Sequence, residues 1–293
     1  MGAPGSASPG SLSHAVRIPG AGLPILSRME SILCEVNDGV MCLTLNRPDK
    51  KNAFNTAQWQ GLRQALVEAR QDPGVGVVVL TGAGKDFSAG QDLTEMLSGG
   101  GGADAGGGGP ESHPFFQTMK ELYAFDKPLL AAAKGVGVGF GATCLFHCDI
   151  VYVGESVRLR LPFVNLGLVP EAASSYMLQT VIGYQRAAEL FFTAEWIDAE
   201  RAVSSGIAAR AFPDDELLGA TLAKAEEIAQ WPAGSLQATK KTLRAPHLDA
   251  IWAAEKAEQE GMKAQVGSPE NVEAVTAFIE KRKPDFQKLM KKA

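Results

Sequence analysis

Two apolar runs, each followed by a glycine-rich loop and the start of a helix, place the strongest constraint on what this chain can fold into. VGVVVLTG (75–82) leads to FSAGQDL (87–93), and LLAAA (129–133) leads to GVGVGFGATC (135–144). Short apolar runs without polar alternation are typical of strands that are buried on both faces. Such strands need helices packed against them, so strands that alternate with helices predict an α/β domain.

Periodicity and turn residues predict the remaining elements. SILCEVNDGVMCLTL (31–45) alternates around Asn-Asp-Gly and predicts a β-hairpin. Apolar residues at helical spacing predict a helix over about 56–70, which Asp72-Pro73 ends. Further helices are expected at about 114–125 and from 171 onwards, further strands at 149–154, 157–162 and 208–212, and an almost wholly helical region at 214–290.

The chain divides into three parts by composition and pattern. Residues 1–28 are rich in Gly, Ser and Pro and contain no acid, so we expect a disordered extension. The α/β core is expected over 29–225. The helical region over 226–293 is expected to cap the core or to dock onto a neighbouring subunit. Within the core, SGGGGADAGGGG (98–109) cannot pack and is expected to be flexible, as a lid or an insertion.

The composition excludes several classes of protein. The 28 Lys and Arg residues are fewer than the 33 Asp and Glu residues and are mostly scattered, so we expect no nucleic-acid partner. The chain has no apolar run of about eighteen residues, so we expect no membrane span. Four cysteines are too few for a disulfide framework. The chain ends in MKKA rather than in a peroxisomal address, and we expect a cytoplasmic setting.

A metal site is the alternative raised by Cys144, His147 and Cys148, which fall at i, i+3 and i+4. Their neighbours Leu145 and Phe146 are apolar, and few other ligands are available. Free cysteine is usually a small buried hydrophobe. We therefore expect core packing here and no metal.

The glycine segment 135–144 has several interpretations. It matches G-x-G-x-x-A, the dinucleotide fingerprint, but it lies mid-chain and its following acid, Glu155, stands in a turn. GAGKD (82–86) resembles a phosphate loop, yet Asp86 stands where a magnesium-binding hydroxyl is required. Close helix–strand packing and an anion site at a helix start are equally compatible with the glycines. Together with FSAGQDL, the segment can aim two backbone N–H groups at one oxygen, as an oxyanion hole does.

Several segments, in order, resemble the enoyl-CoA hydratase/isomerase (crotonase) superfamily. They are LNRPDKKNAF (45–54), VVVLTGAGKDFSAGQDL (77–93), KPLLAAAKGVGVGFGATCLFHCDIVY (127–152), PFVNLGLVPEAASSYML (162–178) and AFIEKRKPDF (277–286). The resemblance implies a spiral of ββα units with C-terminal helices that assemble a homotrimer or a dimer of trimers. It also implies acyl-CoA thioester substrates, no metal, and no cofactor besides the coenzyme A that is part of the substrate.

The resemblance also implies site residues. The two oxyanion donors are the backbone N–H groups of Gln91 and Phe140. Asn165 positions Glu171 or the substrate, or caps a turn, and Asp92 has the alternative role of a helix cap. The expected contacts with substrate or coenzyme A are Lys51, Ala53, Ala89, Gly90, Asp92, Leu93 and Asn165.

The acids distinguish branches of the superfamily. By register, the two positions that carry glutamate in hydratases hold Thr143 and Phe163 here, whereas Glu171 matches the pattern of peroxisomal-type Δ3,Δ2-enoyl-CoA isomerases. We therefore expect a double-bond isomerase in which Glu171 carries the proton. The alternatives are an enoyl-CoA hydratase or another crotonase-type lyase, and a non-catalytic acyl-CoA-binding module. Glu171 is expected at the head of a helix, with desolvation raising its pKa more than the helix N-terminus lowers it.

Overall fold

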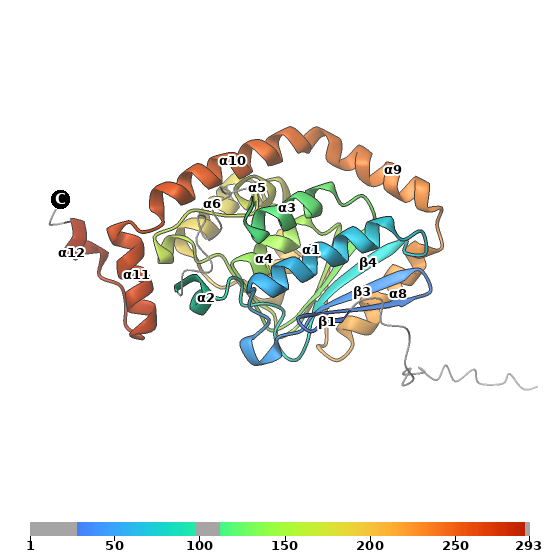
Figure 1. The fold of residues 1–293 in the computed structure, drawn as a ribbon, viewed down its shortest axis with the longest axis horizontal. Coiled ribbons are helices and arrows are strands. Elements are labelled where there is room, and N and C mark those ends of the chain that lie inside the picture. The colour runs from blue at the N-terminus through green and yellow to red at the C-terminus, as the bar shows by residue number, and fades with distance from the viewer. Residues whose placement is uncertain (1–27, 98–111, 291–293) are drawn as a thin grey trace, which may run out of the picture.

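A seven-stranded sheet forms the centre of the molecule, with strand order β1-β2-β3-β4-β5-β7-β9 (Figure 1). The computed structural model describes residues 28–97 and 112–290. The extension expected over 1–28 therefore lies outside the described residues except for Arg28, which belongs to β1 (Arg28–Met29). The glycine-rich tract 98–109 lies wholly outside them.

The sheet combines an antiparallel hairpin with parallel strands. β2 (Ile32–Asn37) and β3 (Val40–Leu45) form the predicted hairpin, and Asp38 and Gly39 at its turn both have positive φ. The parallel strands follow from β3 outward: β4 (Val77–Gly82), β5 (Leu129–Ala133), β7 (Ile150–Gly154) and β9 (Arg210–Phe212). All of β5 is buried, as the apolar run predicts.

Helices cover both faces of the sheet. Met41, Leu43 and Leu80 face the main core, which includes Leu62 and Leu66 of α1 (Thr56–Gln71), and α1 packs beside α3 (Pro114–Ala124). The alternate strand residues Val40, Val77, Val79 and Leu130 face Ala225 of α8 (Leu217–Ala229). The period-2 alternation of strand side chains explains this separation. The α/β class expected from the sequence is thus confirmed.

A second, two-stranded sheet pairs β6 (Val136–Val138) with β8 (Arg158–Arg160) in parallel. Besides α1 and α3, the described helices before α8 are short. They are α2 (Leu93–Leu97), α4 (Phe140–Thr143), α5 (Ser174–Ile182), α6 (Tyr184–Thr193) and α7 (Ala199–Ser205).

The C-terminal region is helical, as expected, and forms an arch along the top of the molecule in Figure 1. α9 (Ala233–Arg244) and α10 (Leu248–Gln265) make the arch, and α11 (Pro269–Ile279) and α12 (Phe286–Met290) stand at one end. The boundary expected at 225/226 falls inside α8, a single helix packed on the sheet. The helical cover of the core therefore continues to Ala229.

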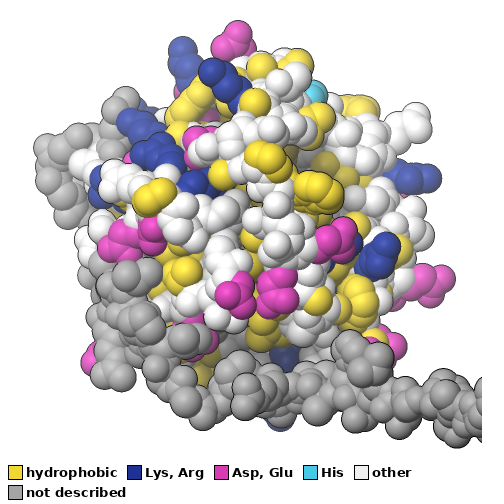
Figure 2. Space-filling view, turned by 90° about the vertical axis from the view of Figure 1, so that its right-hand side faces the viewer, with side chains coloured by type: hydrophobic (Ala, Val, Ile, Leu, Met, Phe, Trp, Pro, Cys, Tyr) yellow, Lys and Arg dark blue, Asp and Glu magenta, His cyan; other side chains and the backbone are white. Residues whose placement is uncertain are grey.

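Acidic, basic and apolar side chains are interspersed on the face that Figure 2 shows. Within residues 28–97 and 112–290, no helix combines the length and the apolar character that crossing a bilayer requires.

Lys240 fastens α9 to the sheet. Its side chain is buried, and its Nζ lies 2.7 Å from a carboxylate oxygen of Asp149 and donates to the carbonyl of Lys127 at 2.8 Å. Burial lowers the pKa of Lys240, and Asp149 opposes that shift. The pair therefore keeps a buried ammonium charged and couples the arch to the segments that lead into β5 and β7.

Lys240→Met keeps an apolar chain of similar length and removes the ammonium. We expect the free energy of unfolding to fall by about 1–3 kcal/mol, because Asp149 and the Lys127 carbonyl lose their donor. Lys241→Met, its exposed neighbour, is the control and should change stability by less than about 0.5 kcal/mol. Urea unfolding monitored by tryptophan fluorescence measures both, and equal stabilities of the two variants would contradict the anchoring role.

Candidate active site

Two loops that are far apart in the sequence lie side by side as extended backbone. Ser88 pairs in parallel with Gly137: the Ser88 N–H donates to the Val136 carbonyl, and the Val138 N–H donates to the Ser88 carbonyl, both at 2.9 Å. The loop after β4 therefore runs against β6, directly before α4.

Glycines make this close approach possible. A Cβ added at Gly90, whose φ is +80°, would lie 2.4 Å from the Val138 carbonyl oxygen and 3.4 Å from the Phe140 nitrogen. A Cβ at Gly141 would lie 2.1 Å from the Ser88 carbonyl oxygen. Since side chains at these positions would collide with backbone, the two loops touch main chain to main chain. This contact places Gly90 at the N-terminus of α4. The backbone N–H of Gln91, the next residue, therefore lies close to α4 as well.

The contact leaves two backbone donors available. The N–H of Gly90 donates to Ser88 Oγ, that of Asp92 to the Phe54 carbonyl and that of Gly139 to the Arg160 carbonyl. Among the described residues, the N–H groups of Gln91 and Phe140 donate to no backbone carbonyl. They are the two groups that the sequence predicts as oxyanion donors, and the loop contact brings their segments together.

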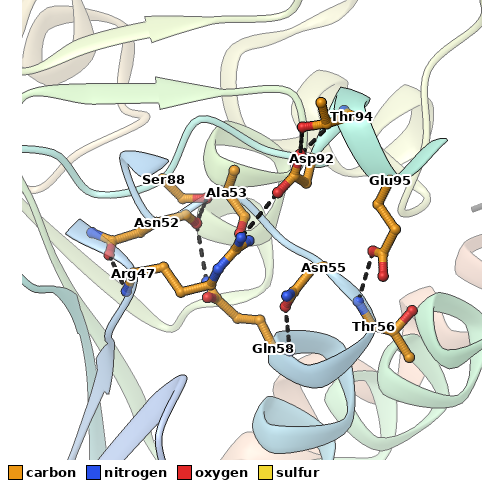
Figure 3. A network of polar contacts seen from close by, with 10 residues as sticks. All are labelled: Arg47, Asn52, Ala53, Asn55, Thr56, Gln58, Ser88, Asp92, Thr94 and Glu95. Carbon is orange, nitrogen blue, oxygen red and sulfur yellow. Dashed lines mark hydrogen bonds and ion pairs between the residues drawn. The ribbon is translucent and has the colours of Figure 1, made fainter. Parts of the chain in front are cut away.

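A polar network fixes the loop 87–93, called the oxyanion loop here after the predicted role of Gln91, to the turn before α1 (Figure 3). The Arg47 guanidinium donates to the Ala53 carbonyl and to Asp92 Oδ2, the latter at 3.0 Å. Buried Asn52 donates to the carbonyls of Ala83 and Asp86, and its own carbonyl accepts from Ser88 Oγ at 2.8 Å. Three segments are thus tied together by side-chain hydrogen bonds to backbone.

Asp92 is occupied within this network. Its Oδ1 accepts from the N–H and hydroxyl of Thr94, as a cap of α2 does, while Oδ2 accepts from Arg47. Burial acts to raise the pKa of Asp92, but hydrogen bonds from Thr94 and Arg47 outweigh it and lower the pKa below its usual value. The geometry therefore gives Asp92 the capping role that the sequence offered as its alternative.

Glu171 faces residues 139–140 at the start of α4, called the oxyanion segment here after the predicted role of Phe140. Its Oε1 is 3.6 Å from the position that a Cβ on Gly139 would take, and its carboxyl interacts with the Phe140 N–H. The pKa of Glu171 is raised to about 8, first by burial and then by the carboxylates of Glu258 and Glu255, while the Phe140 N–H acts to lower it. A half-buried carboxyl with this pKa is a stronger base than an ordinary glutamate.

The expectation that Glu171 heads a helix is wrong. α5 begins at Ser174, and the intervening Ala172 and Ala173 have φ of 62° and 52°, so Glu171 stands in a turn before the helix. Its anion is therefore met by the start of α4, through Phe140, rather than by its own helix. Desolvation does dominate its pKa, as the apolar neighbours predict.

Most of the other predicted contact residues lie at or beside the oxyanion loop, whereas Asn165 does not. Lys51 is exposed with φ of 50°, and its carbonyl accepts from the Ala89 N–H, so it lies at the oxyanion loop. Ala89 and Leu93 are half-buried on that loop, and Ala53 beside it is buried. Asn165 is exposed and its oxygen accepts from Arg160. Among the described contacts it has no hydrogen bond to Glu171.

The two positions that carry acids in hydratases hold buried side chains. Thr143 is fully buried in α4, and its hydroxyl has no hydrogen-bond partner among the residues that the structure describes. Phe163 is buried and packs near Phe191, with ring centroids 6.3 Å apart. These side chains supply neither a carboxylate nor a base.

The Cys144, His147 and Cys148 cluster belongs to the core. His147 Nε2 donates to the Ala172 carbonyl at 2.7 Å, and burial lowers the pKa of His147 to about 3. Burial raises the pKa of both cysteines. In the described part of the chain, no group of three His, Cys, Asp or Glu side chains is placed to hold a metal.

Sequence reasoning missed the supporting residues of the site. Arg47 and Asn52 lie in the quoted RPDKKNAF segment, where polar side chains at a turn were the available signal. His147 and Glu258 act on the Glu171 turn from 25 and 85 residues away along the chain, and no local pattern marks them.

Comparisons with known proteins agree with the geometry. The model of the family enoyl-CoA hydratase/isomerase matches residues 35–289. The chain is 33% identical over 259 residues to 2,3-dehydroadipyl-CoA hydratase of Escherichia coli (strain K12), covering 88% of this chain and 99% of that protein. It is 32% identical over 257 residues to enoyl-CoA delta isomerase 2 of Rattus norvegicus, covering 87% of this chain and 64% of that protein.

The fold also matches a solved structure. The enoyl-CoA hydratase/isomerase from Pseudoalteromonas atlantica T6c superposes with a TM-score of 0.81 at 34% identity, covering 87% of this chain and 99% of that one. The crotonase-like fold expected from the sequence is thereby confirmed. With its loop contact, its glycines and its family match in agreement, the chain belongs to the enoyl-CoA hydratase/isomerase (crotonase) family.

Proposed function

We propose that this protein is a Δ3,Δ2-enoyl-CoA isomerase that uses Glu171 as its proton carrier. The observation that carries the proposal is the position of the Glu171 carboxyl, beside Gly139 and the Phe140 N–H, with a pKa raised to about 8. A carboxylate at this place reaches the carbon next to a thioester carbonyl whose oxygen occupies the oxyanion segment. The substrate is an acyl-CoA thioester, and no separate cofactor takes part.

The reaction needs one base and one electrophilic site. Glu171 removes a proton from C2 of a 3-enoyl thioester, and the C–H electron pair moves through the carbonyl to give a dienolate with its charge on the thioester oxygen. The N–H groups of Gln91 and Phe140 stabilise that charge as it develops, and loss of one such donor typically costs about 3 kcal/mol. Protonated Glu171 then returns its proton to C4, which leaves the double bond between C2 and C3.

Substrate binding strengthens the base. In the free enzyme the Phe140 N–H interacts with the Glu171 carboxyl and lowers its pKa. A thioester oxygen that takes this N–H removes the stabilising contact and excludes water. Both changes favour the protonated form of Glu171 and therefore its action as a base.

Hydration is the alternative supported by the relatives, since the Escherichia coli protein described above is a hydratase. By the resemblance stated above, the hydratases of the superfamily use two acids to add water across C2 and C3. Thr143 and Phe163 stand at those positions, and both oxygens of the nearby Glu258 already accept backbone N–H groups. The residues therefore favour isomerisation over hydration.

Contacts with the coenzyme A portion complete the proposal. Lys51 is exposed on the turn that meets the oxyanion loop, so its ammonium is available to a phosphate group. We assign the same substrate-binding surface to the backbone around Ala53, Ala89, Gly90 and Leu93. We also propose that Asn165 contacts the substrate. Its side chain is oriented by the hydrogen bond that its oxygen accepts from Arg160. We also propose a cytoplasmic setting, in keeping with the four free cysteines.

Glu171→Gln preserves the shape of the side chain and removes the base. We expect kcat for 3-enoyl-CoA to fall by about 10²–10⁴-fold with KM changed little, the range typical of general acid–base catalysis. Glu155→Gln, an exposed acid in a turn, is the control and should keep full activity. The assay follows formation of 2-enoyl-CoA by absorbance; near-wild-type turnover of Glu171→Gln would remove Glu171 from this role. A wild-type enzyme that hydrates trans-2-enoyl-CoA and leaves 3-enoyl-CoA unchanged would instead favour the hydratase.

The pH dependence of kcat/KM follows from the raised pKa of Glu171. Because the base must be ionised and its pKa is about 8, the rate should rise with pH up to about 8 and then level off. An ordinary glutamate would place this limb near its unperturbed pKa, about 4.3. Initial rates at low substrate concentration, measured from about pH 6 to 10, locate the limb. A rate that is flat across this range contradicts the assignment.

We further propose that the protein is a homotrimer or a dimer of trimers, assembled through its C-terminal helices. Apolar side chains on and near α11 are exposed, among them Val266, Val272, Phe278 and Ile279. Phe278→Asp places a charge on this surface and is expected to yield smaller species in sedimentation velocity, whereas Glu280→Gln should leave assembly unchanged. Sedimentation of the wild-type protein as a monomer would contradict the proposal.

A further inference from the structure

The turn that carries Glu171 is in an unfavourable backbone conformation. Ala172 and Ala173 have φ of 62° and 52°, a left-handed region in which a Cβ is crowded. Both are fully buried, and neither is glycine. Two such residues in succession persist only where the surroundings over-determine them. Something outside the turn must therefore hold it.

Glu258 of α10 holds the turn directly. Its Oε2 accepts from the Ala173 N–H at 2.7 Å and its Oε1 accepts from the Ser175 N–H at 2.8 Å. A single carboxylate thus bridges the second left-handed residue and the first turn of α5. The carbonyl of the same Ala172–Ala173 peptide accepts from His147, so this peptide is held at both its N–H and its C=O.

The position of Glu258 is unusual for a carboxylate. It is buried, and within the described residues it forms no ion pair with Lys or Arg. Charge buried without a cation is costly, so backbone N–H groups at a helix start are its compensating partners. These donors belong to the turn that follows Glu171, two and four residues beyond it.

We propose that Glu258 is a positioning residue for Glu171. By accepting the N–H groups of Ala173 and Ser175, it keeps the left-handed turn closed and so keeps the Glu171 carboxyl against the oxyanion segment. The role rests on the proposed function of Glu171 and deepens it. It makes α10 part of the catalytic architecture of its own subunit.

Glu255 provides a matched comparison on the same helix. It is buried one turn before Glu258, but its carboxylate accepts from the Tyr123 hydroxyl and from Gln259. It therefore carries a similar charge near Glu171 but, in the described part of the chain, forms no hydrogen bond to the turn. Glutamine at 255 can still accept from Tyr123, whereas glutamine at 258 can accept only one of the two N–H groups.

The groups that face Glu171 come from three elements. Glu255 and Glu258 lie on α10, Cys144 and His147 lie on the 3-10 turn after α4, and Tyr123 lies on α3 and binds Glu255. The two carboxylates raise the pKa of Glu171, whereas His147 is neutral and hydrogen-bonded to the turn. Loss of either carboxylate charge should therefore lower the pKa of Glu171. Only loss at 258 should also release the turn.

The first experiment compares kinetics of Glu258→Gln and Glu255→Gln in the full-length protein. We expect kcat to fall about 10–100-fold in Glu258→Gln with KM within about threefold of wild type, and to stay within about threefold in Glu255→Gln. A merely structural role would lower the melting temperature and leave kcat per folded enzyme unchanged. Equal kcat values for the two variants overturn the proposal.

A second readout does not depend on isomerase activity. Carbon-13 NMR of glutamate-labelled protein follows the titration of the Glu171 carboxyl, assigned by its loss in Glu171→Gln. We expect a lower pKa in both variants and a changed chemical shift of the ionised carboxyl only in Glu258→Gln, because only there does Glu171 move. An unchanged shift in Glu258→Gln overturns the positioning role. A wild type inactive on 3-enoyl-CoA overturns the proposed function instead, and the titration still decides the role of Glu258.

A third variant guards against failure of folding. Glycine adopts positive φ without steric cost, so Ala173→Gly combined with Glu258→Gln should recover folding and part of the lost kcat. Recovery of the melting temperature without any recovery of kcat or of the Glu171 chemical shift overturns the proposal.

Discussion

The contact between the backbone of residues 88–90 and that of residues 137–141 is the constraint on which the rest of the site depends. Ser88 forms ladder hydrogen bonds to Val136 and Val138, and Gly90 and Gly141 remove the side chains that would separate the loops. Among the described residues, the contact leaves the N–H groups of Gln91 and Phe140 without a backbone carbonyl partner, and the Phe140 N–H meets the Glu171 carboxyl instead. Preorganised main-chain donors cost no reorganisation when charge develops, and a main-chain donor at the first residue of α4 is compatible with the Phe140 side chain.

Opposite demands meet at Glu171. A base that works near neutral pH needs a raised pKa, and burial supplies it, but a buried carboxyl on a loop must also be held in one orientation. Here the apolar surroundings raise the pKa, and the left-handed turn fixes the orientation at a cost in backbone energy. His147 and Glu258 offset that cost, because they bind the carbonyl and the N–H of the Ala172–Ala173 peptide. Strain and desolvation are thus concentrated at one short segment, as is common at catalytic sites.

The sequence predicted the elements because their signals are local. Buried strands such as 129–133, the Asn-Asp-Gly hairpin and the α1 periodicity need no tertiary information, and the glycines at 90 and 141 mark the loop contact. The head of α5 was mispredicted because Ala favours helix, and only contacts made by distant residues force Ala172 and Ala173 into positive φ. Glu258 was missed for the same reason, since an acid on a helix looks solvated until the fold buries it.

In the proposed mechanism, α10 of the C-terminal helical region also supports the site of the α/β core. α11 exposes apolar side chains at one end of the molecule, as an assembly surface does, but α10 places two buried carboxylates behind the Glu171 turn. Under the proposed role of Glu258, α10 couples that end of the molecule to the turn that carries Glu171. A contact that shifts α10 along its axis would move Glu258 relative to the N–H groups of Ala173 and Ser175. Because these residues belong to the turn after Glu171, the shift would also move Glu171. The proposed catalytic geometry thus depends partly on a helix of the C-terminal region.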